Sequence, residues 1–588
     1  MRKLFFILFI LPLMSVNAQQ VDYLVDIQNP RSHYARVSVT ITKPNATSLE
    51  VKMPVWTPGS YMVREFERNV DRVTATNEKG DLTVVKKDKS TWTIANLKGS
   101  NIVTVHYDIY CFEAGVRTSF INNDHAFILP TSCLMYVEKM QQVKGTVKFS
   151  YPEAWHTLST TLPKVADKTF SFNNYDELAD SPIEIGTHKE LSFTVKGVPH
   201  RVAVVGINNC PEEKFTKDLQ KICETMYAIV GQHPCKEYLF IIHHVDEGGG
   251  GLEHANSCVV QMPRLNYTKP DRYTAFLGLC AHEYFHLWNV KRIRPSALGP
   301  FDYSKENYTN LLWVAEGITS YYDELALYRA GFWTREQYLD ALTGGFTATE
   351  NRIGSHVQCL HEASFDAWIK EYRPSENSIN SNISYYTKGA VVAALLDIEI
   401  VKATNGAKHL DDLMAYLYTE YYEKQKRGFT DQEFYAAINT VAGKTIDMVE
   451  WTTKPNDKNT FEKWNEVLKG IGCSLENKPN EAILYTGINT ELKGEKLVVK
   501  STDAASPAVL AGLEAGDELI AIDYYRLKNN MEDLLKLSVN ANSVSITYSR
   551  GGIMRSTSLT MTKSPKVNYK WIILEKDNLL LNKWLVKA

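Results

Sequence analysis

The chain has 588 residues, of which 44% are hydrophobic and 23% are charged, and its formal net charge at pH 7 is only −3. At about 150 residues per domain, this length predicts three or four domains and a large buried core. The balanced charge argues against a basic nucleic-acid-binding surface and against an acidic disordered tail. Small molecules or peptides are therefore the favoured ligands.

Residues 1–18 are predicted to be a secretory signal peptide. A basic start, Met1-Arg2-Lys3, precedes a short apolar run over residues 4–13, and Val16-Asn17-Ala18 stand at the expected cleavage positions. The apolar run is too short to span a bilayer, and the sequence has no later run of about 20 apolar residues. We expect an exported protein, periplasmic or secreted, without a membrane span.

The nine cysteines are scattered along the chain without C-x-x-C spacing. This pattern argues against a zinc site built from thiolates. Export permits disulfides, but an odd count leaves at least one thiol free or intermolecular, and the pairs cannot be assigned from the sequence.

Residues 19–204 are predicted to form an antiparallel β domain with a sandwich architecture, because short alternating or β-branched runs recur between turn residues. Examples are residues 36–41, 102–107, 146–149 and 191–195. Within this region, Pro54 to Tyr61 places prolines around a turn, which we interpret chiefly as a structural corner.

Residues 205–466 are predicted to be mainly helical. Strands are expected near 238–242 and 257–262, on either side of the glycine-rich loop from Gly248 to His254. Four glycines suit either a tight turn or a ligand laid along a sheet edge. Helices are expected at 215–229, 273–290, 308–330, 334–342, 389–404, 410–424 and 431–442, the last marked by a capping-box pattern at Thr430 and Glu433.

The chemistry of the chain is indicated by His282-Glu283-Tyr284-Phe285-His286. On a helix, the two histidines stack on one face and can bind one zinc ion, while Glu283 reaches a metal-bound water and acts as its base. Such a site needs a third protein ligand. Glu316, in an apolar helix, is the best candidate, because a buried carboxylate there requires a compensating cation.

Other residues are weaker candidates around this motif. His243, His244 and His254 are alternative ligands. Asp323 lies seven residues after Glu316, where it could orient a ligand imidazole through its free N–H. Amide hydrolysis also needs an oxyanion donor besides the metal, and Tyr386 is the candidate, although the chain has 32 tyrosines.

Residues 467–565 carry a PDZ-like signature from Ala505 to Ile520. The loop Tyr485-Thr486-Gly487-Ile488 would receive the terminal carboxylate of a peptide that adds a strand to the sheet edge. The usual Asn-Gly is replaced by Asp523-Tyr524-Tyr525, so a packing role competes with peptide binding. Residues 566–588 are expected to be a short appended tail.

Five motifs together resemble the glycyl aminopeptidase family of zinc metallopeptidases: those at 250–254, 282–295, 313–319 and 386–389, and the terminal PDZ signature. The segment from Pro54 to Tyr61 also looks like the N-terminal domain of that family. The catalytic domain of that family is similar to that of aminopeptidase N, which has a thermolysin-like fold.

The resemblance implies roles for individual residues. Glu253 would hold the free α-ammonium of the substrate, Gly250 and Gly251 would line the edge strand that pairs with the peptide, and Tyr386 would be the oxyanion tyrosine. Asp323 occupies the acidic position behind a ligand histidine. The sequence departs from the relatives at His254, which replaces an amide residue, and in a longer interval between His286 and Glu316.

We therefore expect a multidomain α+β protein that acts as an exported aminopeptidase with one Zn²⁺, releasing small N-terminal residues, Gly or Ala, from peptides with a free N-terminus. Two alternatives stay open at this stage. One is a metalloendopeptidase whose PDZ domain recruits peptide C-termini, and the other is a non-catalytic peptide-binding scaffold.

Overall fold

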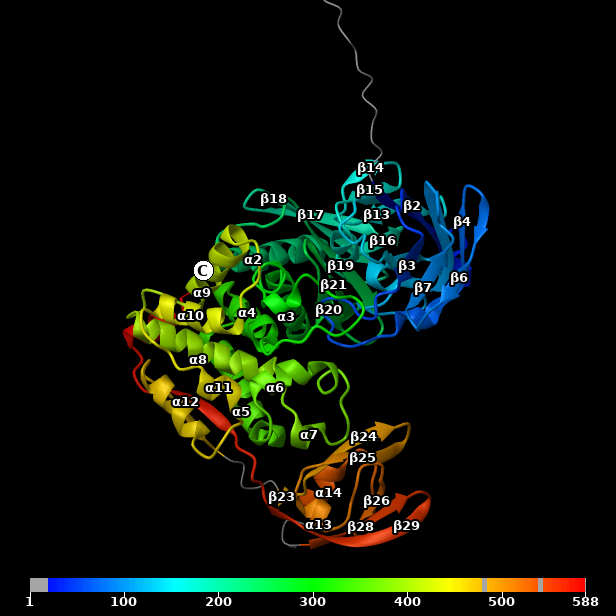
Figure 1. The fold of residues 1–588 in the computed structure, drawn as a ribbon. Helices are drawn as coiled ribbons and strands as arrows, with labels where there is room; N and C mark the ends of the chain where they lie inside the picture. The colour runs from blue at the N-terminus through cyan, green and yellow to red at the C-terminus, as the bar shows by residue number, and fades with distance from the viewer. Residues whose placement is uncertain (1–18, 479–483, 538–542, 587–588) are drawn as a thin grey trace, which may run out of the picture. The chain divides into compact units, whose positions relative to one another are not determined.

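The computed structural model describes residues 19–478, 484–537 and 543–586 (Figure 1). The predicted signal peptide lies outside the described residues. The chain divides into two compact units: the first extends up to Val55 and resumes over Glu65–Thr187, and the second combines Trp56–Arg64 with the chain from His188 onward. The short segment 56–64 thus belongs to the second unit, although the first unit surrounds it in sequence.

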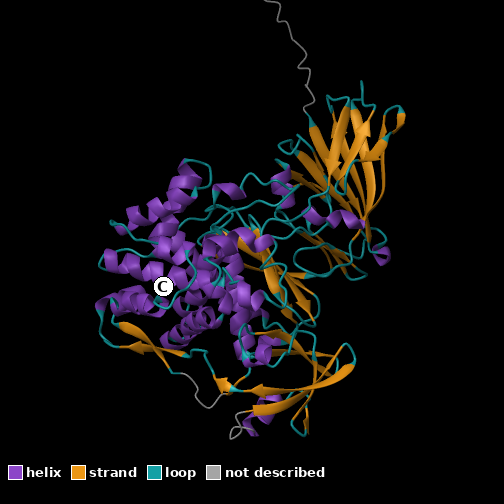
Figure 2. Ribbon diagram, turned by 60° about the horizontal axis from the view of Figure 1, so that its bottom comes forward, coloured by secondary structure: helices purple, strands orange, loops and turns teal. Residues whose placement is uncertain are grey.

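The first unit is built from β-sheets, as predicted (Figure 2). Its strands alternate between the two faces of a sheet: in β2, Ala35, Val37, Val39 and Ile41 are buried while their neighbours are more exposed. Most neighbouring strands are antiparallel, and β1 pairs in parallel with β12. The eight-stranded sheet runs β14 (Lys164–Ala166), β15 (Thr169–Phe172), β12 (Gly145–Ser150), β1 (Gln20–Asp26), β2 (Tyr34–Thr42), β8 (Ile102–Tyr110), β4 (Val70–Asn77) and β5 (Gly80–Leu82).

Two four-stranded sheets and one short helix complete this unit. The first sheet runs β13 (Thr157–Ser159), β16 (Ile183–Gly186), β10 (His125–Ile128) and β9 (Phe120–Ile121). The second runs β11 (Tyr136–Val137), β3 (Ser48–Lys52), β7 (Thr91–Ala95) and β6 (Val84–Lys86), and the helix is α1 (Tyr175–Ala179).

The second unit begins earlier than the predicted boundary at residue 204. Strands β17 (Lys189–Val195) and β18 (Val198–Val205) form a hairpin, and β18 pairs in parallel with β19 (Tyr238–Val245). The sheet continues through β21 (Ser257–Pro263) to β20 (Gly250–Glu253), which is its terminal strand. The alternation of residues 191–195 indicates a strand, but not which sheet the strand joins.

Helices α2 (Glu212–Val230) and α3 (Pro270–Phe285) pack beside this sheet, α3 against β20 and β21. Helix α3 ends at Phe285 with His286 as its C-terminal cap, five residues before the predicted end. The remaining helices are α4 (Ile318–Arg329), α5 (Arg335–Asn351), α6 (Leu360–Phe365), α7 (Ser378–Ser381), α8 (Thr387–Ala403), α9 (Leu410–Leu417), α10 (Asp431–Ala442), α11 (Val449–Thr453) and α12 (Thr460–Lys469).

The predicted capping box before α10 is confirmed, since the Thr430 hydroxyl accepts from the Glu433 amide at 3.3 Å and the Glu433 carboxylate accepts from the Thr430 amide at 2.9 Å. Two predicted helices instead contain π-helical turns, at Trp313–Gly317 ahead of α4 and at Tyr418–Lys424 after α9. Apolar periodicity does not distinguish such turns from an ordinary α-helix.

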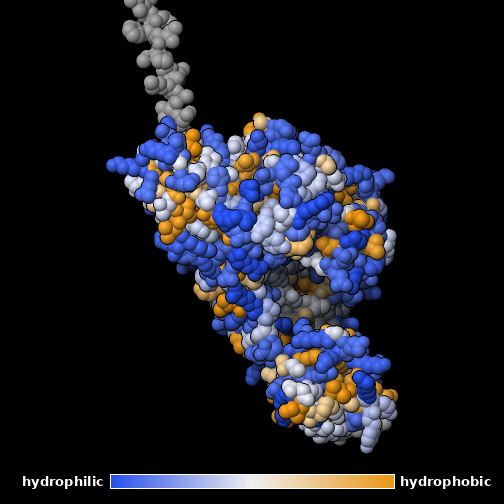
Figure 3. Space-filling model, turned by 90° about the vertical axis from the view of Figure 1, so that its right-hand side faces the viewer, coloured by the Kyte–Doolittle hydropathy of each residue, from blue (hydrophilic) through white to orange (hydrophobic). Residues whose placement is uncertain are grey.

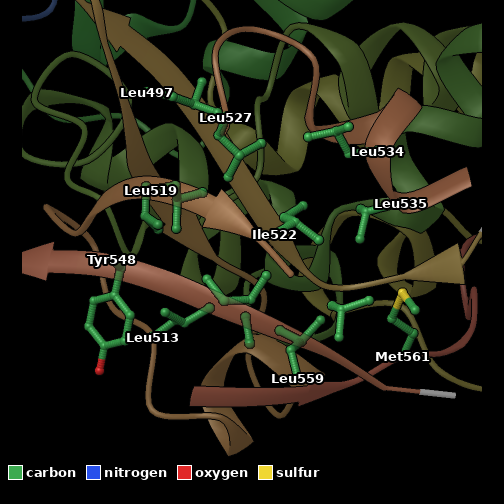
Figure 4. Close-up of a cluster of buried hydrophobic side chains, with 14 residues drawn as sticks. Leu497, Leu513, Leu519, Ile522, Leu527, Leu534, Leu535, Tyr548, Leu559 and Met561 are labelled. Atoms are coloured by element: carbon green, nitrogen blue, oxygen red, sulfur yellow. The ribbon is translucent and has the colours of Figure 1, made fainter. Parts of the chain in front are cut away.

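A C-terminal β region follows, and its side chains form a hydrophobic core of their own (Figure 4). Leu519 and Ile522 from one strand meet Leu534 and Leu535 from a helix and Leu559 from another strand. Its elements are β24 (Ile488–Lys493), β25 (Lys496–Thr502), α13 (Pro507–Leu510), β26 (Glu518–Ile522), β27 (Tyr525–Arg526), α14 (Met531–Leu537), β28 (Ser543–Arg550) and β29 (Ile553–Thr560). Its identity as a PDZ domain stays a prediction.

The last residues form part of the second unit, which differs from the predicted appended tail. Strand β31 (Tyr569–Ile573) pairs with β22 (Cys473–Asn477), and β30 (Thr562–Lys563) pairs with β23 (Leu484–Tyr485). Helix α15 (Leu579–Trp584) packs on α8, where the indole Nε1 of Trp584 donates to Asp397 at 3.1 Å. The hydroxyl of Tyr321 donates to the same carboxylate at 2.6 Å.

The face in Figure 3 is mainly hydrophilic, with hydrophobic side chains scattered among charged ones. In the part of the chain that the structure describes, every helix is too short or too polar to cross a membrane. All nine cysteines are free thiols.

We expect Trp584→Ala to destabilise the second unit by about 3 to 5 kcal/mol, because it removes a fully buried indole and a hydrogen bond to Asp397. Leu579→Ala, on the same helix but 60% exposed, should change stability by less than about 0.5 kcal/mol. Urea unfolding of the full chain, followed by circular dichroism, measures both. Equal stability of the two variants would contradict the anchoring role of α15.

Candidate active site

The end of α3 presents two imidazoles with their Nδ1 atoms already engaged. His282 Nδ1 lies 2.9 Å from the Asp323 carboxylate, and His286 Nδ1 lies 2.6 Å from the carbonyl oxygen of Asn289. Both partners are acceptors, so each imidazole donates from Nδ1 and keeps the lone pair of Nε2 for a further partner. The two Nε2 lone pairs are therefore available for a cation.

The carboxylate of Glu316 faces both lone pairs. Its Oε2 lies 3.4 Å from Nε2 of His282 and 3.3 Å from Nε2 of His286. Glu316 stands in the π-helical turn before α4, where an extra residue per turn shifts the side chain relative to an α-helix. The Asn289 side-chain amide donates to the Val314 carbonyl oxygen at 2.8 Å and links this turn to the loop that holds His286.

These three groups fit a zinc ion. Ligand atoms placed about 2.0 to 2.1 Å from a tetrahedral zinc ion lie about 3.3 Å from one another, which matches both separations. Three electron-pair donors that face one point repel each other unless a cation lies between them. Glu316 is buried, so its carboxylate requires a compensating cation. None of the three alternative ligands weighed from the sequence, His243, His244 and His254, belongs to this group.

Glu283 lies beside this group and against the glycine-rich strand. A Cβ built on Gly251 would overlap the Glu283 carboxylate, so the carboxylate rests on the Cα of Gly251. Burial raises the pKa of the Glu283 carboxyl to about 7 against the opposing effect of the two imidazoles. Among the residues described, its Oε2 has no hydrogen-bond partner. A buried carboxylate of this kind is suited to accept a proton.

Glu253 ends the terminal strand β20, which Gly250 begins. Glu253, Glu283 and His286 each offer an atom within 4.8 Å of the other two. Glu253 is buried, and within the described chain its Oε1 has no hydrogen-bond partner. A buried carboxylate without a partner costs several kcal/mol, unless a cationic ligand pairs with it.

Tyr386 immediately precedes α8 and lies over His282, with ring centroids 6.3 Å apart. Its hydroxyl lies 3.2 Å from the hydroxyl of Tyr372. The start of α8 approaches the Glu316 turn closely because Gly317 and Gly389 face each other, and a Cβ on either would overlap the other's Cα. The two glycines thus bring the tyrosine and the carboxylate to the same site.

Sequence reasoning missed the segment Trp56–Arg64 as part of the site. A Cβ on Gly59 would overlap the carboxylate of Glu253, and the buried ring of Tyr61 lies near the carboxylates of Glu316 and Glu253. Tyr372, which joins Tyr386 and the Gly59 carbonyl oxygen, was also missed. The sequence signal that could have indicated this role is the Pro-Gly pair between two aromatic residues, Trp56 and Tyr61.

The predicted peptide loop Tyr485–Ile488 belongs to the C-terminal β region. The Thr486 carbonyl oxygen accepts from the Ala508 amide at 2.9 Å, and the Gly487 carbonyl oxygen accepts from the Asp503 amide at 2.8 Å. The Ile488 amide donates to the Thr486 hydroxyl at 3.2 Å. These bonds fix the loop, and its role in binding a peptide stays a prediction.

Comparisons with known proteins point to one family. Residues 22–187 match the family model described as the peptidase M61 N-terminal domain, and residues 275–392 match M61 glycyl aminopeptidase. A solved aminopeptidase N family protein from Idiomarina loihiensis is 28% identical, with a TM-score of 0.89 over 96% of this chain and 100% of that chain. No curated protein matches at a significant level.

More distant solved structures also match. An M1 zinc metallopeptidase from Deinococcus radiodurans is 12% identical over 72% of this chain and 90% of that chain, with a TM-score of 0.46. Yeast LTA4 hydrolase in complex with bestatin is 12% identical over 76% of this chain and 72% of that chain, with a TM-score of 0.47. Similarity at this level establishes neither the fold nor the function of the chain.

We expect Asp323→Asn to weaken zinc binding about 10- to 100-fold, because the amide replaces the anionic acceptor that orients the His282 imidazole. Glu324→Gln is the matched control: it changes the next carboxylate on α4, whereas the carboxylates that pair with the His282 imidazole are those of Asp323 and Glu316. Competition with a chromogenic chelator measures both affinities. A similar loss in the two variants would show that α4 as a whole, and not the Asp323 bond, supports the metal.

Proposed function

We propose that the chain is a zinc metallopeptidase of the M61 glycyl aminopeptidase family, which its match to the models of that family supports, and that it removes single N-terminal residues from peptides with a free amino group. His282, His286 and Glu316 would hold one zinc ion. When bound, zinc activates a water molecule and polarises the substrate carbonyl group. The further steps depend on side chains of this chain.

The position of Glu253 carries the exopeptidase assignment. One of its carboxylate oxygens is within 4.8 Å of a carboxylate oxygen of Glu283 and of a ring nitrogen of His286. A substrate ammonium bound to Glu253 leaves room for one residue between the amine and the peptide bond that faces Glu283. An endopeptidase needs a cleft that continues past this point, so buried Glu253 favours removal of one residue at a time.

Glu283 is proposed to accept the proton of the attacking water and to pass it to the leaving amine. Burial raises its pKa to about 7. A base with a pKa near the working pH can both accept and release the proton. The contact with Gly251 holds its carboxylate against the strand along which the peptide would lie.

Tyr386 is proposed to donate a hydrogen bond to the oxyanion that forms at the substrate carbonyl. Burial raises the pKa of its phenol, which therefore stays protonated. The hydroxyl of Tyr372, 3.2 Å away, fixes its orientation. A donor that is held in place before the reaction stabilises the oxyanion without reorganisation.

The family resemblance supports Gly or Ala as the residue released. The predicted export signal supports a periplasmic or secreted location, and the C-terminal region is proposed to be a PDZ domain with a peptide C-terminus as its ligand. Cleavage of an N-blocked, internally quenched peptide would favour the endopeptidase alternative instead.

We expect Glu253→Gln to lower kcat/KM for free-amine substrates by about 10- to 100-fold, because the ammonium loses a charge-assisted hydrogen bond in a buried site. Hydrolysis of matched N-acetylated substrates should stay at its low wild-type level. A chromogenic glycyl anilide and its acetylated form, assayed side by side, measure the change. If the variant lost equal activity on both substrates, Glu253 would not recognise the amine.

We expect Glu283→Gln to lower kcat by about 100- to 10,000-fold with unchanged zinc content, because the amide cannot accept a proton. Zinc analysis of the purified variant accompanies the assay. Zinc-bound protein in which no peptide hydrolysis depends on Glu283 would instead support the scaffold alternative.

A further inference from the structure

The segment Trp56–Arg64 is held firmly within the second unit. The indole Nε1 of Trp56 donates to the Asp302 carbonyl oxygen at 2.8 Å, and its ring packs edge-on against Trp368 with centroids 5.1 Å apart. Tyr61 packs against the same Trp368 at 5.8 Å. Arg373 donates to the Val63 carbonyl oxygen at 3.1 Å. These contacts define the position of the segment at both of its ends.

Gly59 brings the backbone of this segment directly onto Glu253. Its φ of +87° is a conformation that residues with a Cβ rarely adopt. The place where a Cβ would stand is filled by both carboxylate oxygens of Glu253. The backbone of Gly59 thus covers the Glu253 carboxylate on this side, while Glu283 and His286 each offer an atom within 4.8 Å of it.

Tyr61 borders the space between the amine-binding and metal-binding groups. Its ring is buried, it follows Gly59 by two residues, and burial, together with the charges of Glu316 and Glu253 that both act on its hydroxyl, raises the pKa of the phenol. Tyr372 packs against it at 6.1 Å and links the Gly59 carbonyl oxygen to the hydroxyl of Tyr386. The segment and the proposed oxyanion donor are therefore parts of one packed cluster.

A substrate bound as proposed must place its first α-carbon within this space. Its amine would pair with Glu253 and its carbonyl group would face the site of His282, His286 and Glu316, so the α-carbon lies between Glu253 and Glu316. Tyr61 lies near both of these carboxylates. A large side chain on the first residue would need volume that the Tyr61 ring occupies.

We propose that Gly59 and Tyr61 determine specificity: together they restrict the released residue to one with no side chain or a very small one. This inference rests on the proposed aminopeptidase function and assigns its selectivity to a segment that precedes the rest of the second unit by more than a hundred residues in sequence. Gly59 limits the room around the amine, and Tyr61 limits the room around the α-carbon.

Binding of amino-acid hydroxamates to the zinc-loaded, full-length protein tests the role of Tyr61 without hydrolysis. Calorimetric titration should show that the wild type binds glycine hydroxamate at least about tenfold more tightly than leucine hydroxamate. Tyr61→Ala should reduce this preference by about tenfold or more. Tyr61→Leu, which keeps an apolar side chain, should shift it in the same direction, and Tyr61→Phe should leave it unchanged.

The matched control for Tyr61 is Tyr338→Ala, which removes a fully buried tyrosine of α5. It should keep the wild-type preference. Equal binding of the two hydroxamates to the wild type would overturn the inference. The inference would also be overturned if Tyr61→Ala and Tyr61→Leu both kept the preference for glycine hydroxamate within about twofold of the wild-type value.

Gly59→Ala tests the contact with Glu253. It should weaken glycine hydroxamate binding by about tenfold or more at unchanged zinc content, because the new methyl group displaces the carboxylate. Gly197→Ala has nearly the same backbone strain, with a φ of +88°, but meets no atom within 4 Å, and should bind normally. Normal binding by Gly59→Ala would overturn its assigned role.

The two proposals fail separately. If the wild type shows the hydroxamate preference but releases no N-terminal residue from any free-amine peptide, the aminopeptidase proposal fails and the size restriction stands. If it hydrolyses glycyl and leucyl peptides equally well and Tyr61→Ala changes neither rate, the size restriction fails and the aminopeptidase proposal stands.

Discussion

The site depends on the convergence of three electron-pair donors on one point. Oε2 of Glu316 lies 3.4 Å from Nε2 of His282 and 3.3 Å from Nε2 of His286, and the Nδ1 atoms of the two histidines face the Asp323 carboxylate and the Asn289 carbonyl oxygen. Without a cation, these donors repel one another inside a buried site. The end of α3, the π-helical turn and the bonds behind the histidines all serve to hold this arrangement.

Around the metal-binding group, the geometry depends on glycines at close contacts. Gly251 lies under the Glu283 carboxylate, Gly59 lies on the Glu253 carboxylate, and Gly317 faces Gly389 where the Glu316 turn meets α8. At each contact, a methyl group would occupy the place of a functional atom or of the opposing backbone. The positions of the side chains that would act on the substrate thus depend on glycines, because only a residue without a Cβ lets the backbone come this close.

Local patterns in the sequence predicted the local features of this structure. Helix geometry alone predicts that His282 and His286, four residues apart, share one face. The capping box at Thr430 likewise marks the start of α10. The seven-residue spacing also predicted that Asp323 and Glu316 share a face. The π-helical turn, the membership of β17 in the second unit and the position of Gly59 on Glu253 could not be predicted, because each is decided by contacts between residues far apart in sequence.

The second unit uses both ends of the chain. It takes Trp56–Arg64 from one end and β31 and α15 from the other, and α15 places Trp584 on the carboxylate of Asp397 in α8, the helix that follows Tyr386. A ribosome must therefore synthesise the chain through Trp584 before α8 acquires this buried neighbour.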